Sequence, residues 1–124
     1  MKAKALIALL LGIFAFLYVA EGVLLNPFAI WNAAPLVVFY ALHARGSALA
    51  DRRRVWGAFG FLLGSMAVSI PFHIAWMLDL GAIRTGSSTS ALAFLFIPIH
   101  ACIAGGIGFL LGWCVRHLGR GRGA

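Results

Sequence analysis

Four long apolar segments, separated by short polar stretches, make up most of the chain. They cover residues 5–25, 28–44, 55–78 and 91–115. Each segment reaches or nearly reaches the ~17–25 residues that a helix needs to cross a bilayer. A soluble domain would interrupt such runs with polar residues every few positions, because part of each element meets water. The pattern predicts an all-α integral membrane protein, with a single domain of four transmembrane helices over residues 1–124.

The composition agrees with this prediction. Hydrophobic residues make up 63% of the chain and charged residues 10%, whereas soluble domains average roughly 45–50% apolar and ~25% charged residues. The net charge of +7 is also found in proteins that bind nucleic acids. Here, however, the basic residues lie at the ends of the apolar segments rather than along one soluble surface. We therefore expect a lipid bilayer, and not a nucleic acid, as the partner.

The lysines and arginines are distributed very unevenly between the two sides of the predicted membrane. Arg84, in the loop after the third segment, is the single cation on its side. The other nine are Lys2, Lys4, Arg45, Arg52, Arg53, Arg54, Arg116, Arg120 and Arg122. Because cations in short loops stay in the cytoplasm during insertion, we expect both termini there, including the basic tail 116–124. The short loops predict an up-down antiparallel bundle, and the arginine-rich, lysine-poor composition points to a bacterial inner membrane.

Small residues recur at helical spacing in three of the segments. Lipid tails are as apolar as leucine, so membrane helices associate through close backbone approach at small residues. The first, third and fourth segments offer the candidate packing glycines Gly12, Gly60, Gly64, Gly105, Gly108 and Gly112. In the third segment Ser65, Ser69 and His73 form a second stripe, and His73 lies ~180° from Gly64 at 100° per residue. We expect protein on both sides of this segment, either from a central position in the bundle or from a second copy or another subunit.

Three ionisable residues fall at membrane depth. From the rise of 1.5 Å per residue, Glu21 lies ~6 Å, His73 ~7.5 Å and His100 ~13.5 Å below the outer end of their segments. Such groups are costly in lipid and are candidates for function by default. Together with Ser69 they form our set of intramembrane polar candidates.

These residues allow several interpretations. Glu21 and His73 lie at similar depth and are able to pair with each other as a structural contact. Alternatively, Glu21 is a proton-coupled site that exchanges a proton for a cationic substrate. His73 and His100 are also weak candidates for a haem b or metal site, because two imidazoles from facing helices suit a low-spin haem. Their ~6 Å difference in depth counts against that arrangement, so no cofactor is expected.

The prolines predict bends and freed backbone carbonyls. Asn26-Pro27 predicts a tight turn, and the stretch 32–35 predicts a helix start or a kink. Pro71 and Pro98 each stand two residues before a histidine. Each proline removes the hydrogen bond to the carbonyl four residues earlier. The freed carbonyls, of Ala67 and Phe94, are natural partners for a histidine N–H, a water or a hydroxyl.

No motif for a soluble-type active site is present. The sequence contains no phosphate-binding loop, HExxH, paired CxxC or nucleophile elbow, so no enzymatic activity is expected. The arginines Arg52, Arg53 and Arg54 are explained by membrane topology, and they are also candidates for binding anionic lipid head groups.

In size, in its four predicted spans and in the single glutamate of its first span, the chain resembles the small multidrug-resistance transporters. The residues around Glu21, YVAEGVLLNP, depart from the pattern of that family. The resemblance is therefore one of architecture alone.

The third segment carries small or polar residues on both of its sides. The sequence therefore favours a small membrane protein that acts through helix–helix contacts. It would serve as an accessory, assembly or scaffolding subunit, or as a homo-oligomer. The second hypothesis is a small proton-coupled transporter or channel that uses Glu21. The third is a haem b or metal protein that uses His73 and His100.

Overall fold

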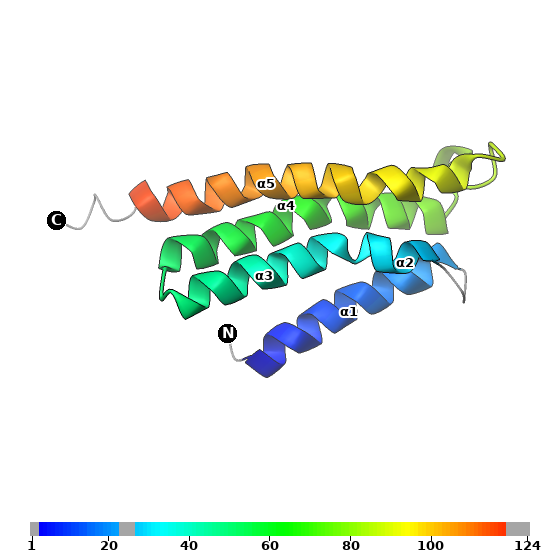
Figure 1. The fold of residues 1–124 in the computed structure, drawn as a ribbon. Coiled ribbons are helices and arrows are strands. Elements are labelled where there is room, and N and C mark those ends of the chain that lie inside the picture. The colour runs from blue at the N-terminus through cyan, green and yellow to red at the C-terminus, as the bar shows by residue number, and fades with distance from the viewer. Residues whose placement is uncertain (1–2, 23–26, 119–124) are drawn as a thin grey trace.

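The computed structural model describes residues 3–22 and 27–118, and these residues form helices and turns without any strand (Figure 1). The elements are α1 (Ala3–Glu21), α2 (Pro27–Asn32), α3 (Ala34–Ala48), α4 (Arg52–Met77), η1 (Leu80–Ala82), η2 (Ser90–Leu92) and α5 (Ala93–Leu118). Within the described ranges, four helical stretches are long and apolar enough to cross a membrane: Ala3–Glu21, Pro27–Ala48, Arg52–Met77 and Ser90–His117. The all-helical, multi-pass class predicted from the sequence is confirmed at this level.

The helix bounds differ from the predicted segments mainly at the arginine-rich turn. Helix α3 continues to Ala48, beyond residue 44, and α4 begins at Arg52 instead of residue 55. The Asp51 carboxylate accepts hydrogen bonds from the backbone N–H groups of Arg53 and Arg54, at 2.9 and 3.3 Å, and so caps α4. The polar stretch is thus mostly helical, because polar side chains at a helix end do not interrupt its backbone hydrogen bonds.

The predicted break in the second segment is confirmed. Helix α2 ends at Asn32, and α3 starts at Ala34 with a proline in its first turn. Pro35 lacks the N–H that would continue α2. In contrast, Pro71 and Pro98 lie inside α4 and α5, which remain continuous helices. The predicted features at residues 23–26 and 119–124 lie outside the described residues.

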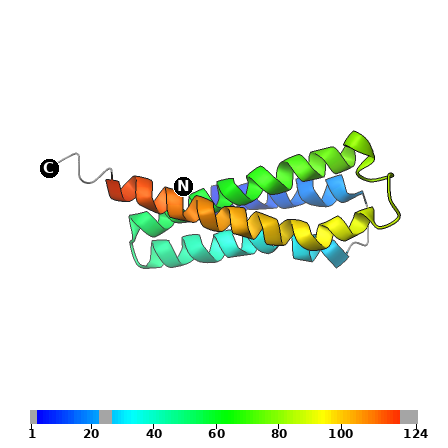
Figure 2. The same ribbon diagram turned by 90° about the horizontal axis from the view of Figure 1, so that it is seen from above.

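Helices α3, α4 and α5 lie side by side, while α1 leans away from them toward its N-terminal end (Figures 1 and 2). The core lies between α1, α3 and α4, and its buried members are Leu6, Leu36, Phe39, Ala58, Phe61, Leu62 and Met66. The start of α1, the turn between α3 and α4 and the end of α5 lie toward one end of the molecule, and η1 and η2 lie at the other (Figure 1).

Helices α4 and α5 cross in direct backbone contact. A Cβ atom at Gly60 would overlap the carbonyl of Gly108, and one at Gly108 would overlap the carbonyl of Gly60. A Cβ atom at Gly64 would likewise overlap the Ala104 carbonyl, and one at Gly112 would lie 2.5 Å from the Trp56 oxygen. Only glycine permits this separation, and the close approach provides the packing that holds helices together in lipid.

The other two candidate packing glycines differ from each other. A Cβ atom at Gly105 would lie 2.8 Å from the Phe61 ring, so this position is also tightly packed. A Cβ atom at Gly12 would have no neighbour within 4 Å. Gly12 instead lines an open apolar groove between α1 and α4.

Both stripes of α4 are covered by this same chain. Its glycines meet α5, and Ser65, Ser69 and His73 on the opposite side are all buried. This arrangement agrees with the central position, the first of the two explanations for small or polar residues on both sides of the third segment.

Candidate functional site

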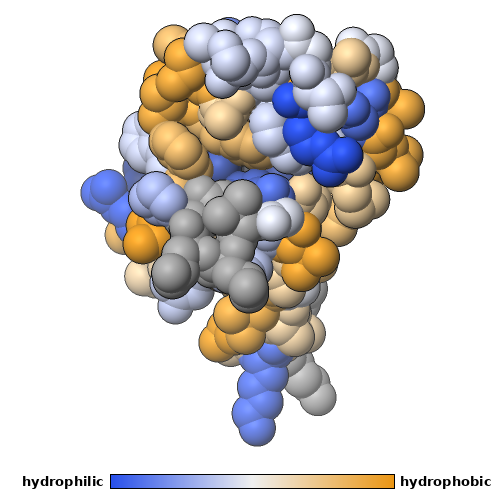
Figure 3. Space-filling model, turned by 90° about the vertical axis from the view of Figure 1, so that its right-hand side faces the viewer, coloured by the Kyte–Doolittle hydropathy of each residue, from blue (hydrophilic) through white to orange (hydrophobic). Residues whose placement is uncertain are grey.

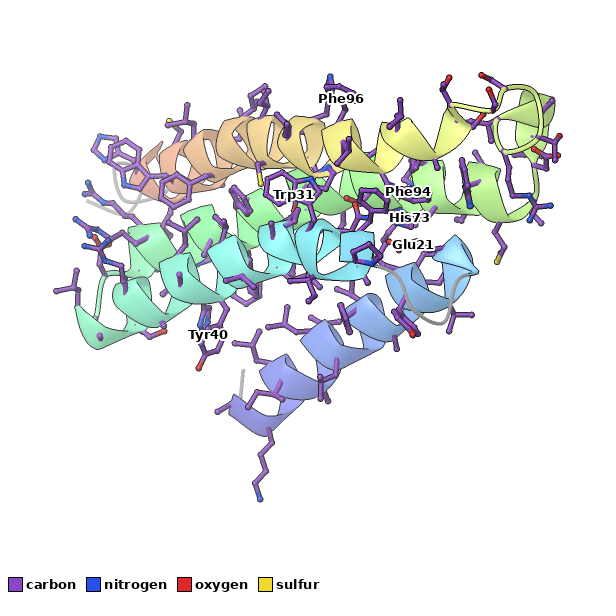
Figure 4. The ribbon with its side chains drawn as sticks, turned by 45° about the vertical axis from the view of Figure 1, so that its right-hand side comes forward. Glu21, Trp31, Tyr40, His73, Phe94 and Phe96 are labelled. Atoms are coloured by element: carbon purple, nitrogen blue, oxygen red, sulfur yellow. The ribbon has the colours of Figure 1, made fainter. Side chains whose placement is uncertain are left out.

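Three polar residues from three helices meet near one end of the bundle. Glu21 is the last residue of α1, Asn32 is the last residue of α2, and His73 lies in α4; their exposed fractions are 4%, 2% and 0%. Figure 4 shows Glu21, His73 and Phe94 gathered between the helices. We refer to Glu21, Asn32 and His73 as the polar cluster.

Local backbone features position the first two members. Helix α1 stops at Glu21 because Gly22 takes a left-handed conformation, with φ +73°, which is how glycine commonly ends a helix. The Gly22 N–H donates to the Val19 carbonyl at 3.1 Å. Asn32 stands at the break before Pro35, where α2 ends. Both side chains therefore project from helix ends into the interior.

The hydrogen bonds of the polar cluster converge on one carboxyl oxygen. Asn32 Nδ2 donates to Glu21 Oε1 at 2.9 Å, and His73 Nε2 lies 3.4 Å from the same oxygen. On the other side of the imidazole ring, Nδ1 lies 2.7 Å from the Ser69 carbonyl oxygen. The predicted Ser69 thus takes part through its backbone, and the structure brings Glu21 and His73 together.

The partners of the two ring nitrogens indicate which proton arrangements make the contact between His73 and Glu21 attractive. A carbonyl oxygen only accepts hydrogen bonds, so the proton of a neutral His73 lies on Nδ1 and its Nε2 is an acceptor. A carboxylate oxygen is an acceptor as well. The contact between Nε2 and Glu21 Oε1 is therefore attractive only when one further proton lies between them. That proton belongs either to a carboxylic acid facing a neutral imidazole or to an imidazolium facing a carboxylate.

Either arrangement of the shared proton leaves the pair without net charge. Removing the proton leaves a buried carboxylate opposite an imidazole lone pair, and adding a second leaves a buried imidazolium opposite a carboxylic acid. An uncompensated charge in a low-dielectric interior is strongly unfavourable.

One polar atom of the cluster has no hydrogen-bond partner within the described ranges. Asn32 Oδ1 is buried, and it is the one such side-chain atom that the described part of the chain contains. A buried carbonyl oxygen of this kind costs about 1–3 kcal/mol when it is unsatisfied. Asn32 Oδ1 and the Glu21 carboxyl group both offer acceptor oxygens. Together they suit a cation that carries hydrogen-bond donors.

Aromatic rings cover the cluster on the α5 side. The Phe94 ring centroid lies 5.6 Å from that of His73 and 4.7 Å from that of Trp76. Phe72 also contacts Phe94, edge to face, at 5.4 Å. Phe94 is 4% exposed, so the imidazole is shielded by apolar surface. This shielding strengthens every electrostatic interaction in the cluster.

The two histidines do not share a site. His100 is exposed on α5, and its Nδ1 lies 2.9 Å from the Phe96 carbonyl, whereas His73 is enclosed and both of its ring nitrogens have partners. Residues 3–22 and 27–118 contain no group of three or more residues that would hold a metal ion. The bis-histidine arrangement that a haem requires is thus not formed between these residues.

The histidine rings contact backbone carbonyls other than those freed by the prolines. His73 and His100 contact the carbonyls of Ser69 and Phe96, not those of Ala67 and Phe94. Side chains on a helix lean toward its N-terminus. Each ring nitrogen therefore meets the carbonyl four residues before its own residue, rather than the one freed by the neighbouring proline.

The adjacent arginines of the α3–α4 turn have separate contacts. Arg54 Nε pairs with Asp51 Oδ2 at 3.2 Å, and the Arg53 guanidinium lies over the Trp113 ring at 5.9 Å. Arg52 is exposed. Arg52 and Arg53 line one pocket with Arg116, whereas Arg54 faces a separate groove.

The sequence analysis missed two members of the site. Asn32 was assigned only to a helix boundary, although an amide within an apolar segment is itself a signal of a buried partner. Phe94 carries no such signal, because phenylalanine is common throughout membrane spans. Comparison of the chain with protein-family models, curated proteins and solved structures finds no match.

Proposed function

We propose that the chain is a small proton-coupled membrane transporter or channel in which Glu21 and His73 hold the exchangeable proton. The observation that carries this proposal is the 3.4 Å contact of His73 Nε2 with Glu21 Oε1, in a ring whose Nδ1 faces a carbonyl oxygen. No catalytic reaction is included in the proposal.

A change in the proton number requires a compensating charge or an opening, and the cluster suggests both. The Asn32 amide oxygen and the Glu21 carboxyl group would bind a cation in place of the proton, which is the exchange expected of a proton-coupled carrier. The opening would occur at α1, of whose 19 residues only Leu6, Leu17, Ala20 and Glu21 are buried. Glu21 thus connects α1 to the bundle through polar contacts, whereas few other side chains of this helix are buried.

The proposed topology is an up-down antiparallel bundle in the bacterial inner membrane, with both ends in the cytoplasm. Among the described residues, Arg84 is the one cation of the η1–η2 end, and the others lie near the opposite ends of their helices: Lys4, Arg45, Arg52, Arg53, Arg54 and Arg116. Viewed from the η1–η2 end, the molecule shows hydrophilic and near-neutral residues above and hydrophobic ones on the flanks (Figure 3). This distribution supports an end that leaves the bilayer on the outer side.

The test uses the purified protein in liposomes that contain a pH-sensitive dye. Guanidinium, a cation that carries N–H donors, serves as the probe, and proton release on its addition is recorded. We expect the wild type to release protons and Glu21→Gln to abolish the release. The glutamine atom that replaces Oε1 can either accept from Asn32 or donate to His73, but not both, so circular dichroism must show that the variant is folded.

The matched control is Asp79→Asn, which removes one carboxylate from the exposed loop after α4. Proton release by this variant should equal that of the wild type. If Glu21→Gln releases as much as the wild type, or if Asp79→Asn abolishes release equally, Glu21 does not hold the transported proton.

A second candidate is the accessory, scaffolding or homo-oligomeric role, which is favoured by the apolar grooves beside α1. One groove, between α1 and α3, has a volume of 300 Å³, and another, between α1 and α4, has a volume of 550 Å³. A further membrane helix would fill either groove. A monomer in mild detergent that purifies without a partner would contradict this role, whereas a stable dimer or a stoichiometric partner would support it.

A further inference from the structure

A groove with both charged and apolar walls lies at the end of the bundle near the α3–α4 turn. It is lined by Leu42 and Arg45 of α3, Arg54 of α4, and Phe109 and Trp113 of α5, and its volume is 340 Å³. Three helices therefore contribute to it. It lies at the opposite end of the bundle from the polar cluster and shares no residue with it.

The polar wall of the groove is cationic. Arg45 is exposed, and the Arg54 side chain is 49% exposed. The adjacent carboxylate, Asp51, pairs with Arg54 through the Nε atom of the guanidinium, at 3.2 Å. Two guanidinium groups present a planar array of donors that matches the oxygens of a phosphate group.

The remaining wall is apolar. Leu42 and Phe109 are half-buried, and the Phe109 ring lies against α4 at Gly57. Phe109 and Trp113 are one turn apart on α5, so this wall extends ~6 Å from the arginines toward the middle of the helices. Tryptophan is also the residue most typical of the boundary between head groups and acyl chains.

We infer that this groove binds one anionic phospholipid. Its phosphate contacts Arg45 and Arg54, and the first part of an acyl chain lies along Leu42 and Phe109. A free phosphate ion would use the arginines alone and would gain nothing from the apolar wall. The combination of both walls on helices that are able to span a membrane favours the lipid.

This inference revises the head-group residues predicted from the sequence. Arg54 remains, but Arg53 is engaged with Trp113, and Arg52 does not line this groove. Arg45, which was counted only for topology, replaces them. The reason is that α3 and α4 lie side by side, which brings residues nine positions apart in the sequence to one groove.

Native mass spectrometry of the detergent-purified full chain tests the inference. The probes are phosphatidylglycerol and phosphatidylcholine with identical chains, dihexanoyl phosphatidylglycerol, and glycerol 3-phosphate. We expect one long-chain phosphatidylglycerol to bind in preference to phosphatidylcholine. Arg45→Gln should weaken its binding about fivefold, since one cation near the membrane surface is worth ~1 kcal/mol.

Arg52→Gln is the matched control, because it removes the same charge from the same turn outside the groove. Arg52→Gln should bind phosphatidylglycerol as tightly as the wild type does. Arg54→Gln should weaken phosphatidylglycerol binding as Arg45→Gln does. If loss of the Asp51 contact unfolds Arg54→Gln, the test still stands on Arg45→Gln. Equal losses in Arg45→Gln and Arg52→Gln would overturn the inference in favour of diffuse surface charge.

Two further outcomes would also overturn it. Equal retention of phosphatidylglycerol and phosphatidylcholine would show that the arginines do not select the anion. If glycerol 3-phosphate or the short-chain lipid binds as tightly as the long-chain lipid, the groove is a phosphate site rather than a lipid site. Weaker binding of both short probes, together with the loss in Arg45→Gln, supports the lipid.

Discussion

Replacing Gly108 with alanine is expected to force α4 and α5 apart at their crossing point and to destabilise the bundle. The Cβ atom would overlap the Gly60 carbonyl, and both groups belong to helical backbones. Backbone atoms cannot move away by changing a rotamer, as a side chain can. The helices themselves must therefore separate.

The magnitude follows from the spacing at the crossing. Even at Gly112, the least crowded of these positions, a Cβ atom would lie 2.5 Å from the Trp56 oxygen, about 0.9 Å short of the 3.4 Å of an ordinary contact. Overpacking of this kind costs ~1–3 kcal/mol, and the rigid partner at Gly108 argues for the upper value. Alanine regains ~1 kcal/mol of helix propensity, so the expected net loss is ~2 kcal/mol.

Gly106→Ala is the matched control, because it lies in the same helix and its Cβ atom would have no neighbour within 4 Å. The propensity gain is common to both variants, so the difference between Gly108→Ala and Gly106→Ala isolates the steric cost, ~3 kcal/mol. Unfolding in mixed dodecyl maltoside and sodium dodecyl sulfate micelles, followed by circular dichroism, measures this difference. Equal stability of the two variants would refute the proposed backbone contact.

The double variant Gly60→Ala with Gly108→Ala sharpens the test. Both Cβ atoms act at the same crossing, so one outward shift of α5 relieves both overlaps. The combined loss should be smaller than the sum of the two single losses. Strict additivity would indicate that the two glycines act at separate contacts.

Three further predictions concern polar contacts. Asn32→Leu should lower the free energy of unfolding by about 1–3 kcal/mol in the same micelle assay, because the buried Glu21 Oε1 loses its amide donor; no change would contradict this role. Asp51→Ala should cost ~1 kcal/mol through loss of the α4 cap, and an unchanged unfolding curve would refute it. The hydrogen bonds from the Thr85 hydroxyl and the Arg84 N–H lower the pKa of Asp79 below its ordinary value of 3.8. Their stabilisation is thus present above pH 3.8 and is lost as the pH falls through the folded pKa. Thr85→Ala should raise that pKa toward 3.8 in a carboxyl NMR titration, and an unchanged titration would contradict the assigned cause.

The sequence determined the class of this protein and the approximate extent of its helices. Hydrophobic length is a property of consecutive residues, and the bilayer imposes one length on all of them. The break before Pro35 was also predictable, because a missing N–H has the same effect in any surroundings. For the same local reason, depths along a helix, such as those of Glu21 and His73, follow from the rise per residue.

The tertiary structure alone decided which groups meet. Depth does not give the rotation of a helix about its axis, so His73 points into the bundle while His100, after a similar Ile-Pro pair, points out. The hydrogen bond from Asn32 to Glu21 depends on how α2 is oriented relative to α1. Likewise, Gly12 and Gly108 look alike in the sequence, but only Gly108 meets another backbone. Contacts between helices are set by the packing of all of them together, which no single segment encodes.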